Sequence, residues 1–335
     1  ETSLNIAKKL KELTSEKFQA AFLVNGHKGL ADAAGIGAIA AKKGAPILFT
    51  SNSRLEATRS DLGQLGIDNV YVIGGNLSLV GEFDRIATSV ERIAGSNRQE
   101  TSLKMMNKFN PNPAVVYLTD DGGVRANRLI DAVLINSGII ASNAQASASD
   151  KGVEQVGPTK SPKSSNLAEG AVLLVNSNNG LSFNQYKTLY NMSSLTGLTQ
   201  VSGGDALTNS MGILSNLMQN KGNAKADQAF DRLMKLEYLT TEYNVYGTKK
   251  QIEGSQFLST LKMDSSFNFI YDRARMESLL KNMDNKAVPK QLSDSYAYWK
   301  NGDVIISKMK QVTKMDLDYE VNRLSGILKS GVSTY

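Results

Sequence analysis

Short apolar runs alternate with segments of helical periodicity over the first two thirds of the chain. The runs are rich in β-branched and aromatic residues, as in buried strands, while the segments between them carry apolar residues every three or four positions. In the first copy of this pattern we predict strands over 20–24, 46–50 and 70–73, and helices over 30–43, 54–65 and 79–88. Alternation of this kind gives a mostly parallel sheet covered by helices.

The same order returns farther along the chain. Strands are predicted over 114–118, 172–175 and 198–201, and helices over 129–140, 183–190 and 209–218. Ser182 precedes the helix over 183–190, and serine is a preferred N-cap because its hydroxyl accepts a hydrogen bond from the helix start.

From about Asn223 the alternation ends. Helices are predicted there over 226–243, 276–283, 304–312 and 318–328, and short helices or strands over 257–261 and 267–271. The last third, 223–335, is therefore expected to be a mainly helical segment.

The chain also resembles itself at an offset of about 99 residues. Two groups of residues recur at that offset, Glu1-Thr2-Ser3-Leu4 as Glu100-Thr101-Ser102-Leu103, and Leu30, Asp32 and Ala33 as Leu129, Asp131 and Ala132. Farther on the offset grows, with 47–49 matching 172–174 and Gly74-Gly75 matching Gly203-Gly204. Ordered matches indicate an internal duplication. We expect modules over 1–91 and 92–222, with a surface-loop insertion at about 142–170 in the second.

The composition excludes several kinds of functional site. The 335 residues contain no cysteine, which excludes disulfides, thiolate metal sites and cysteine nucleophiles. His27 is the sole histidine, so one chain cannot form a site with two histidine ligands. The longest apolar runs are too short to span a bilayer. The net charge of +6 is spread along the chain, whereas nucleic-acid-binding proteins concentrate theirs in a patch. We predict no nucleic-acid partner and no cofactor.

Three motifs follow one another through the first copy and its junction with the second. The stretch 30–33 leads through a helix to 46–50, the stretch 70–73 ends in Gly74-Gly75, and 92–101 reads Arg-Ile-Ala-Gly-Ser-Asn-Arg-Gln-Glu-Thr. Together they resemble the type 2 cell-wall-binding repeat of clostridial surface proteins, whose opening pattern is Arg-Ile-x-Gly-x-x-Arg-x-Glu-Thr. The second copy keeps Asp131-Ala132, Leu173-Leu174 and Gly203-Gly204 but lacks the proline before its second strand. The resemblance covers about 1–220.

The resemblance implies an α/β fold of tandem Rossmann- or Toprim-like three-layer modules with mostly parallel sheets. It also implies non-covalent binding to an anionic cell-wall polysaccharide. On this interpretation the protein is secreted, lies in the cell wall or surface layer, is not an enzyme, and has other surface-layer subunits as partners in homo- or hetero-oligomers. Family members usually carry three modules. This chain shows two, and the first lacks the opening strand because the sequence starts at Glu1.

The resemblance also implies the polymer-binding residues. They are Lys42, Lys43, Pro46, Ile47, Leu48, Phe49, Arg92, Arg98, Leu173 and Leu174. A guanidinium suits bidentate contact with phosphate or carboxylate, but a structural salt bridge, for example with Glu100, explains the two arginines equally well. The two lysines also suit the negative end of a helix dipole. Both explanations stay open.

Other residues have a structural and a functional interpretation. Asp32 and Asp131 suit the first turn of a helix, or an acid–base pair. The glycine pairs suit tight turns, or phosphate binding before a helix. His27 follows a strand, where ligands often bind. The alternative functions are a Rossmann-like enzyme acting on a nucleotide or sugar, and a wall hydrolase with its activity in 223–335. Each would need clustered acids or bases.

Overall fold

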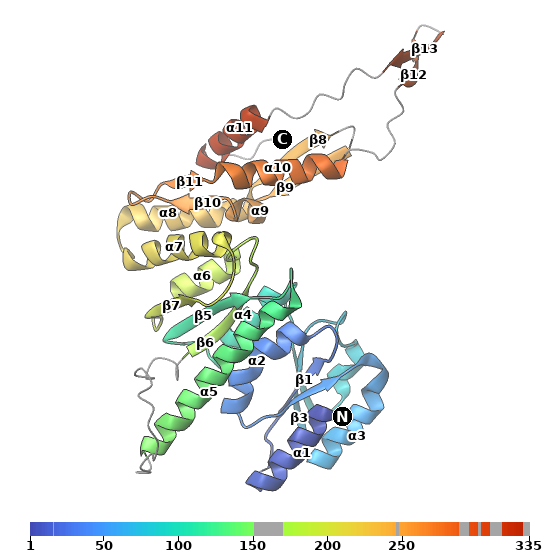
Figure 1. Ribbon diagram of the computed structural model, residues 1–335, viewed down its shortest axis with the longest axis vertical. Coiled ribbons are helices and arrows are strands. Elements are labelled where there is room, and N and C mark those ends of the chain that lie inside the picture. Colours follow the sequence, from blue (N-terminus) through green and yellow to red (C-terminus); the bar gives the residue numbers. More distant parts are fainter. Residues whose placement is uncertain are drawn as a thin grey trace. The chain divides into compact units, whose positions relative to one another are not determined.

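The computed structural model describes the chain except for residues 16, 151–169, 246–247, 288–294, 301–302, 309–316 and 331–335. The chain divides into two compact units, Glu1–Ser215 and Asn216–Tyr335. Figure 1 shows their elements in sequence colours. The predicted insertion at about 142–170 lies mostly outside the described residues. None of the described helices has the length and apolar character needed to cross a membrane.

The first unit contains two parallel sheets whose strands follow one another in the same order. The first runs β2-β1-β3-β4 and the second β6-β5-β7. The first comprises β1 (Ala21–Asn25), β2 (Ile47–Thr50), β3 (Asn69–Ile73) and β4 (Ser89–Ile93), and the second β5 (Val115–Asp120), β6 (Gly170–Val175) and β7 (Gly197–Gln200). Because β2-β1-β3 and β6-β5-β7 have the same connectivity, the topology supports the duplication seen in the sequence. The predicted α/β class is confirmed.

Helices cover both sheets. They are α1 (Thr2–Thr14), α2 (Leu30–Lys42), α3 (Leu55–Leu65), α4 (Arg98–Phe109), α5 (Ile130–Asp150), α6 (Phe183–Asn191) and α7 (Asp205–Gln219). The apolar core on one face of the first sheet includes Leu62 and Leu65 from α3. The other face packs Phe22 and Ile73 against Ile36 of α2. Both faces of the first sheet are thus buried, which explains the continuous apolar strands.

Helix α2 also joins the two modules. Its Ala31 and Ala34 share a buried cluster with Leu129, Ala132 and Leu174 of the second module. Asn136 of α5 enters this contact, because its Oδ1 accepts from the Ala38 N–H at 2.9 Å and its Nδ2 donates to the Ala34 carbonyl at 2.6 Å. These backbone groups lie four residues apart on α2, so one side chain of α5 bonds to two successive turns of α2.

Several predictions are corrected in the first unit. The second module was expected to begin at Arg92, but Arg92 lies within β4, which pairs with β3 in the first sheet. The boundary at 91/92 therefore cuts through a strand of the first module. The segment 79–88 holds only a 3₁₀ turn, η2 (Gly81–Arg85), although Leu79, Phe83 and Ile86 are buried as expected. The sequence patterns also failed to predict α1 and α4, which begin at the repeated Glu-Thr-Ser-Leu segments.

The second unit combines helices with antiparallel strand pairs. The helices are α8 (Ala224–Lys235), α9 (Gly254–Leu258), α10 (Arg273–Ala287) and α11 (Leu317–Ser330), with a 3₁₀ turn, η5 (Leu236–Tyr238), directly after α8. The strand pairs are β8 (Thr240–Val245) with β9 (Thr248–Glu253), β10 (Leu261–Met263) with β11 (Phe269–Tyr271), and β12 (Ser295–Lys300) with β13 (Asp303–Lys308).

This mixture corrects the expectation of a mainly helical segment. The predicted helix over 226–243 ends at Lys235, and β8 follows it after the 3₁₀ turn. The predicted helix over 304–312 overlaps β13, whose Val304 pairs with Trp299, and its residues 309–312 lie outside the described residues. Both strands are rich in β-branched or aromatic residues, which suit a pleated surface.

Candidate functional site

The predicted polymer-binding residues of the first module lie at opposite edges of its sheet. Lys42, Lys43 and Pro46 precede β2, so they lie at the edge where the parallel strands begin. Arg98 starts α4 after the end of β4, and Arg92 bonds to the carbonyl of Gly74 just past β3. These two arginines lie toward the edge where the strands end. The set therefore does not form a single site.

Several of the predicted contacts are corrected because the side chains are enclosed. Leu48 is 4% exposed, and Leu173 and Leu174 are 0% exposed. Pro46 is buried as well, and Ile47 is half-buried. A polymer at the surface cannot contact the buried leucines, whose contribution is to the core. Phe49 is the exception, with 44% of its surface exposed on the edge strand β2.

Arg92 is a structural residue. Its Nε donates to Asp84 Oδ1 at 2.7 Å, its Nη1 to the Gly74 carbonyl at 2.8 Å, and its Nη2 to the Val80 carbonyl at 3.1 Å. All three nitrogens of the guanidinium are thus engaged, and the side chain is only 14% exposed. The salt-bridge interpretation holds for this arginine, with Asp84 as the partner in place of Glu100.

Carboxylates gather where the strands of both sheets end. Asp32, Asp120 and Asp121 are buried there, and Arg98 donates to the Asp121 carbonyl at 3.1 Å. The Ser177 hydroxyl donates to Asp120, and the Gln99 amide to Asp121.

Burial changes the acidity of two of these groups. Burial raises the pKa of Asp32 to about 6 against the opposing charge of Arg98. Burial also raises the pKa of Asp121, although the Gly123 N–H and Arg98 favour its charged form. This edge therefore combines three buried carboxyl groups with the guanidinium groups of Arg92 and Arg98. Among the described residues, no three histidine, aspartate or glutamate side chains are arranged to hold a metal ion.

The remaining candidates occupy turns and helix starts. Gly74 and Gly203 have φ of 97° and 123°, values that L side chains rarely adopt, so the tight-turn interpretation accounts for both. Asp32 and Asp131 lie in the first turns of α2 and α5, as the dipole interpretation expects. His27 is exposed in a turn where Asn25 Oδ1 accepts its backbone N–H at 2.9 Å.

The edge where the strands begin has the opposite character. Lys42 and Lys43 end α2, Lys108 lies near the end of α4, and the rings of Tyr71 and Phe109 lie between these elements. We call these five residues the basic–aromatic face. Lys43 Nζ lies 5.1 Å from the Phe109 ring centroid, and Lys108 Nζ lies 5.9 Å from the centroids of both rings. The rings meet edge to face at 4.9 Å.

Two hollows adjoin at Lys43 on this face. One, of about 230 Å³, is also lined by Lys42, Phe109 and Asn110. The other, of about 500 Å³, is also lined by Tyr71, Asn69 and Glu91. Glu91, the acidic residue that lines this hollow, pairs with Lys108 at 2.7 Å. Lys42 and Lys43 therefore have no acidic partner among the described residues. Free ammonium groups beside aromatic rings can attract acidic groups and contact sugar rings.

Comparisons with known proteins match the part of the chain that contains most of this face. A family model described as "Cell wall binding domain 2 (CWB2)" matches residues 1–81. Residues 1–81 are thus similar to a cell wall binding domain. The domain contains Lys42, Lys43 and Tyr71 of the basic–aromatic face, and it places the protein at the cell wall. The resemblance noted in the sequence is confirmed.

Similar proteins match only part of their own length. An N-acetylmuramoyl-L-alanine amidase, LytC of Bacillus subtilis strain 168, is 36% identical over 91 residues, which are 27% of this chain and 18% of the amidase. Cwp8 from Clostridium difficile aligns at 27% identity and a TM-score of 0.48 over 64% of this chain and 32% of its own. Cwp6 from the same organism aligns at 20% identity and a TM-score of 0.45 over 63% and 29%. The chain thus spans less than a third of each.

Proposed function

We propose that the protein is a non-catalytic anchor that binds an anionic cell-wall polysaccharide through the basic–aromatic face and takes part in surface assembly. The observation that carries this proposal is the coincidence of the cell wall binding domain over 1–81 with two lysines that lack an acidic partner among the described residues. Other surface-layer subunits are the partners we propose for the assembled state. Both roles require an exported protein and no cofactor.

The mechanism we propose combines charge with ring contacts. Lys42 and Lys43 attract phosphate or carboxylate groups of the polymer, and Tyr71 and Phe109 offer apolar faces to the C–H faces of sugars. Each exposed charge contributes at most about 1 kcal/mol. Stable attachment therefore requires many weak contacts along one polymer. Each contact raises the effective concentration of the neighbouring polymer groups, so no single site has to bind tightly.

Co-sedimentation with Gram-positive cell walls tests this function. Binding is expected to walls that retain their anionic polysaccharide and to be lost from stripped walls. The variant K42Q/K43Q is expected to bind roughly tenfold more weakly. K28Q/K187Q is the matched control, since both lysines are exposed, in the turn after β1 and on α6, and neither lines the two hollows of the face. Equal binding by the two variants would reject the basic–aromatic face, and equal binding to stripped walls would reject the anionic polymer.

A wall hydrolase is the second candidate, because one similar protein is an amidase. That similarity covers 27% of this chain, and no nucleophile–base motif is recognisable in the sequence. Release of soluble fragments from walls incubated with the full chain would support the hydrolase. Walls that bind the protein and stay intact would support the anchor.

A further inference from the structure

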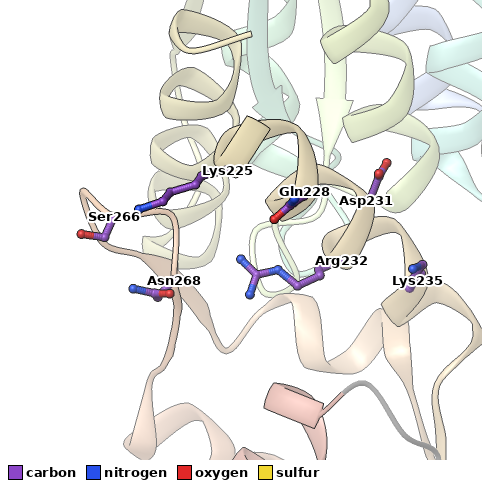
Figure 2. Close-up of a pocket in the computed structure, with 7 residues that line it drawn as sticks. All are labelled: Lys225, Gln228, Asp231, Arg232, Lys235, Ser266 and Asn268. Carbon is purple, nitrogen blue, oxygen red and sulfur yellow. The ribbon is translucent and has the colours of Figure 1, made fainter. Parts of the chain in front are cut away.

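A second basic surface lies in the Asn216–Tyr335 unit, on α8 and the turn between β10 and β11. Lys225, Gln228, Arg232 and Lys235 recur at helical spacing on α8, while Ala226, Ala229 and Leu233 on its other side are buried. The exposed residues line a cavity of about 500 Å³ together with Ser266 and Asn268 of the turn. We call this cavity the α8 groove, and Figure 2 shows its lining side chains.

The turn that forms one wall of the groove is held in a defined shape. Asp264 accepts from the backbone N–H groups of Ser266 at 2.9 Å and Asn268 at 2.8 Å, and from the Asn268 amide at 3.1 Å. Phe267 between them has φ of 63°, which a non-glycine residue adopts only when its surroundings enforce it. The hydroxyl of Ser266 and the amide of Asn268 therefore have fixed backbone positions beside the cavity.

Arg232 connects the helix to this turn. Its Nη2 donates to the Phe267 carbonyl at 3.0 Å, and the guanidinium lies 5.8 Å from the Phe269 ring centroid. These two contacts orient a group that carries five N–H donors, most of which stay available. In Figure 2, Lys225 and Arg232 both reach toward the turn of Ser266 and Asn268. The groove is thus lined by an oriented guanidinium and by the exposed ammonium of Lys225.

The charge of the lining favours an anion. Three cations line the groove against one carboxylate, Asp231, which points away from the guanidinium in Figure 2. Neither Lys225 nor Lys235 pairs with an acidic side chain within the part of the chain that the structure describes. The amides and hydroxyl of Gln228, Asn268 and Ser266 add neutral hydrogen-bonding groups of the kind that pair with sugar hydroxyls.

We propose that the α8 groove is a second site for an anionic sugar unit, with its phosphate or carboxylate held by Arg232 and Lys225 and its hydroxyls by the amides. The choice of a wall glycan as ligand rests on the proposed anchoring function. The groove itself does not depend on it, because it belongs to a different unit from the cell wall binding domain. It gives the second unit a binding role.

The test is a titration of the full chain followed by NMR at the amides of Ser266 and Asn268 and at Arg232 Nε–H. The probes are short poly(glycerol phosphate), oligogalacturonate and neutral dextran. Shifts are expected with one or both acidic probes and none with dextran. Shifts with the phosphate probe alone identify a phosphate site, and shifts with galacturonate identify a carboxylate site. Absence of shifts with both acidic probes overturns the proposal.

Variants separate this site from the anchoring face. K225Q/K235Q removes two exposed charges and leaves the Arg232 contacts in place. The affinity for the acidic probe, measured from the NMR shifts, is expected to fall roughly tenfold. K28Q/K187Q, with the same loss of charge, is expected to leave them unchanged. K42Q/K43Q is also expected to leave them unchanged while it weakens wall co-sedimentation. Unchanged affinity in K225Q/K235Q overturns the groove, whereas normal co-sedimentation of K42Q/K43Q overturns the anchoring face alone.

Discussion

At the scale of single residues, Asp32 lies in the first turn of α2 with 8% of its surface exposed. Its folded pKa of about 6 exceeds its ordinary value of 3.8. The folded state therefore holds a proton that the unfolded state has lost, and its free energy of unfolding falls as pH rises from about 4 to about 6. The loss amounts to about 3 kcal/mol at most.

The variant D32N is expected to escape this loss. At pH 7 it should unfold at a higher temperature than the wild type, and the difference should vanish near pH 4. Thermal unfolding measured across this pH range checks the prediction. D131N, at the equivalent position of the second copy, is the matched control. A D32N variant that is less stable than the wild type at pH 7 would mean that attraction to Arg98 outweighs the cost of burial.

Arg92 supports a second residue-scale prediction. R92A removes a partly buried charge-assisted bond to Asp84 and two bonds to the carbonyls of Gly74 and Val80. A loss of about 2 to 3 kcal/mol in the free energy of unfolding is expected, measured by denaturant titration. R85A, which loses the same charge at an exposed position, is expected to change stability by less than about 0.5 kcal/mol.

The folded fraction of R92A is expected to bind walls normally, because all three guanidinium nitrogens bond within the protein. If fully folded R92A binds walls more weakly than the wild type, Arg92 contacts the polymer, as the resemblance implies.

At the scale of elements, the contact between α2 and α5 depends on one buried side chain. Asn136 is 4% exposed and bonds to Ala34, Ala38 and Ala132. N136A is expected to lower the free energy of unfolding by about 2 kcal/mol, since the side-chain hydrogen bonds that it removes are buried. S137A on the exposed side of α5 is the control. Calorimetry of both variants measures the difference.

The elements also show which sequence patterns were informative. Helices α2, α3 and α6 and the strands β1 and β6 were predicted because their buried faces are apolar, and Ser182 forms the capping box expected of an N-cap. Helix α4 was missed because its buried face includes polar residues. Ser102 accepts from the Leu174 N–H and Gln99 donates to Asp121, so hydrogen bonds there replace the apolar contacts that a pattern detects.

The candidate site was predictable only in part. Lys42 and Lys43 were identified from the resemblance, but Tyr71, Lys108 and Phe109 were not. These five side chains come from three separate elements of the chain, and only the fold brings the rings within 4.9 Å of each other. Burial likewise excluded three predicted contacts. Leu48 lies on the covered face of β2, and Leu173 and Leu174 lie in β6, whose side chains are buried on both faces.

At the scale of the whole molecule, the net charge of +6 is modest and spread over the sequence. Long-range attraction is therefore weak, and the binding we propose depends on lysines that lie close to the polymer. Short-range contacts between exposed charges are still screened by salt, whereas contacts between rings and sugars are not. Ionic strength consequently separates the two contributions.

Wall binding is expected to weaken roughly tenfold or more between about 0.05 M and about 0.5 M sodium chloride, where the screening length falls from about 14 Å to about 4 Å. K42Q/K43Q is expected to show a shallower dependence than K28Q/K187Q, because it has lost charges that contact the polymer. Co-sedimentation across the salt series measures both slopes. Binding that is tight and insensitive to salt in all variants would instead make the rings Tyr71 and Phe109 the main contacts, and substitutions at those rings would then have to abolish it.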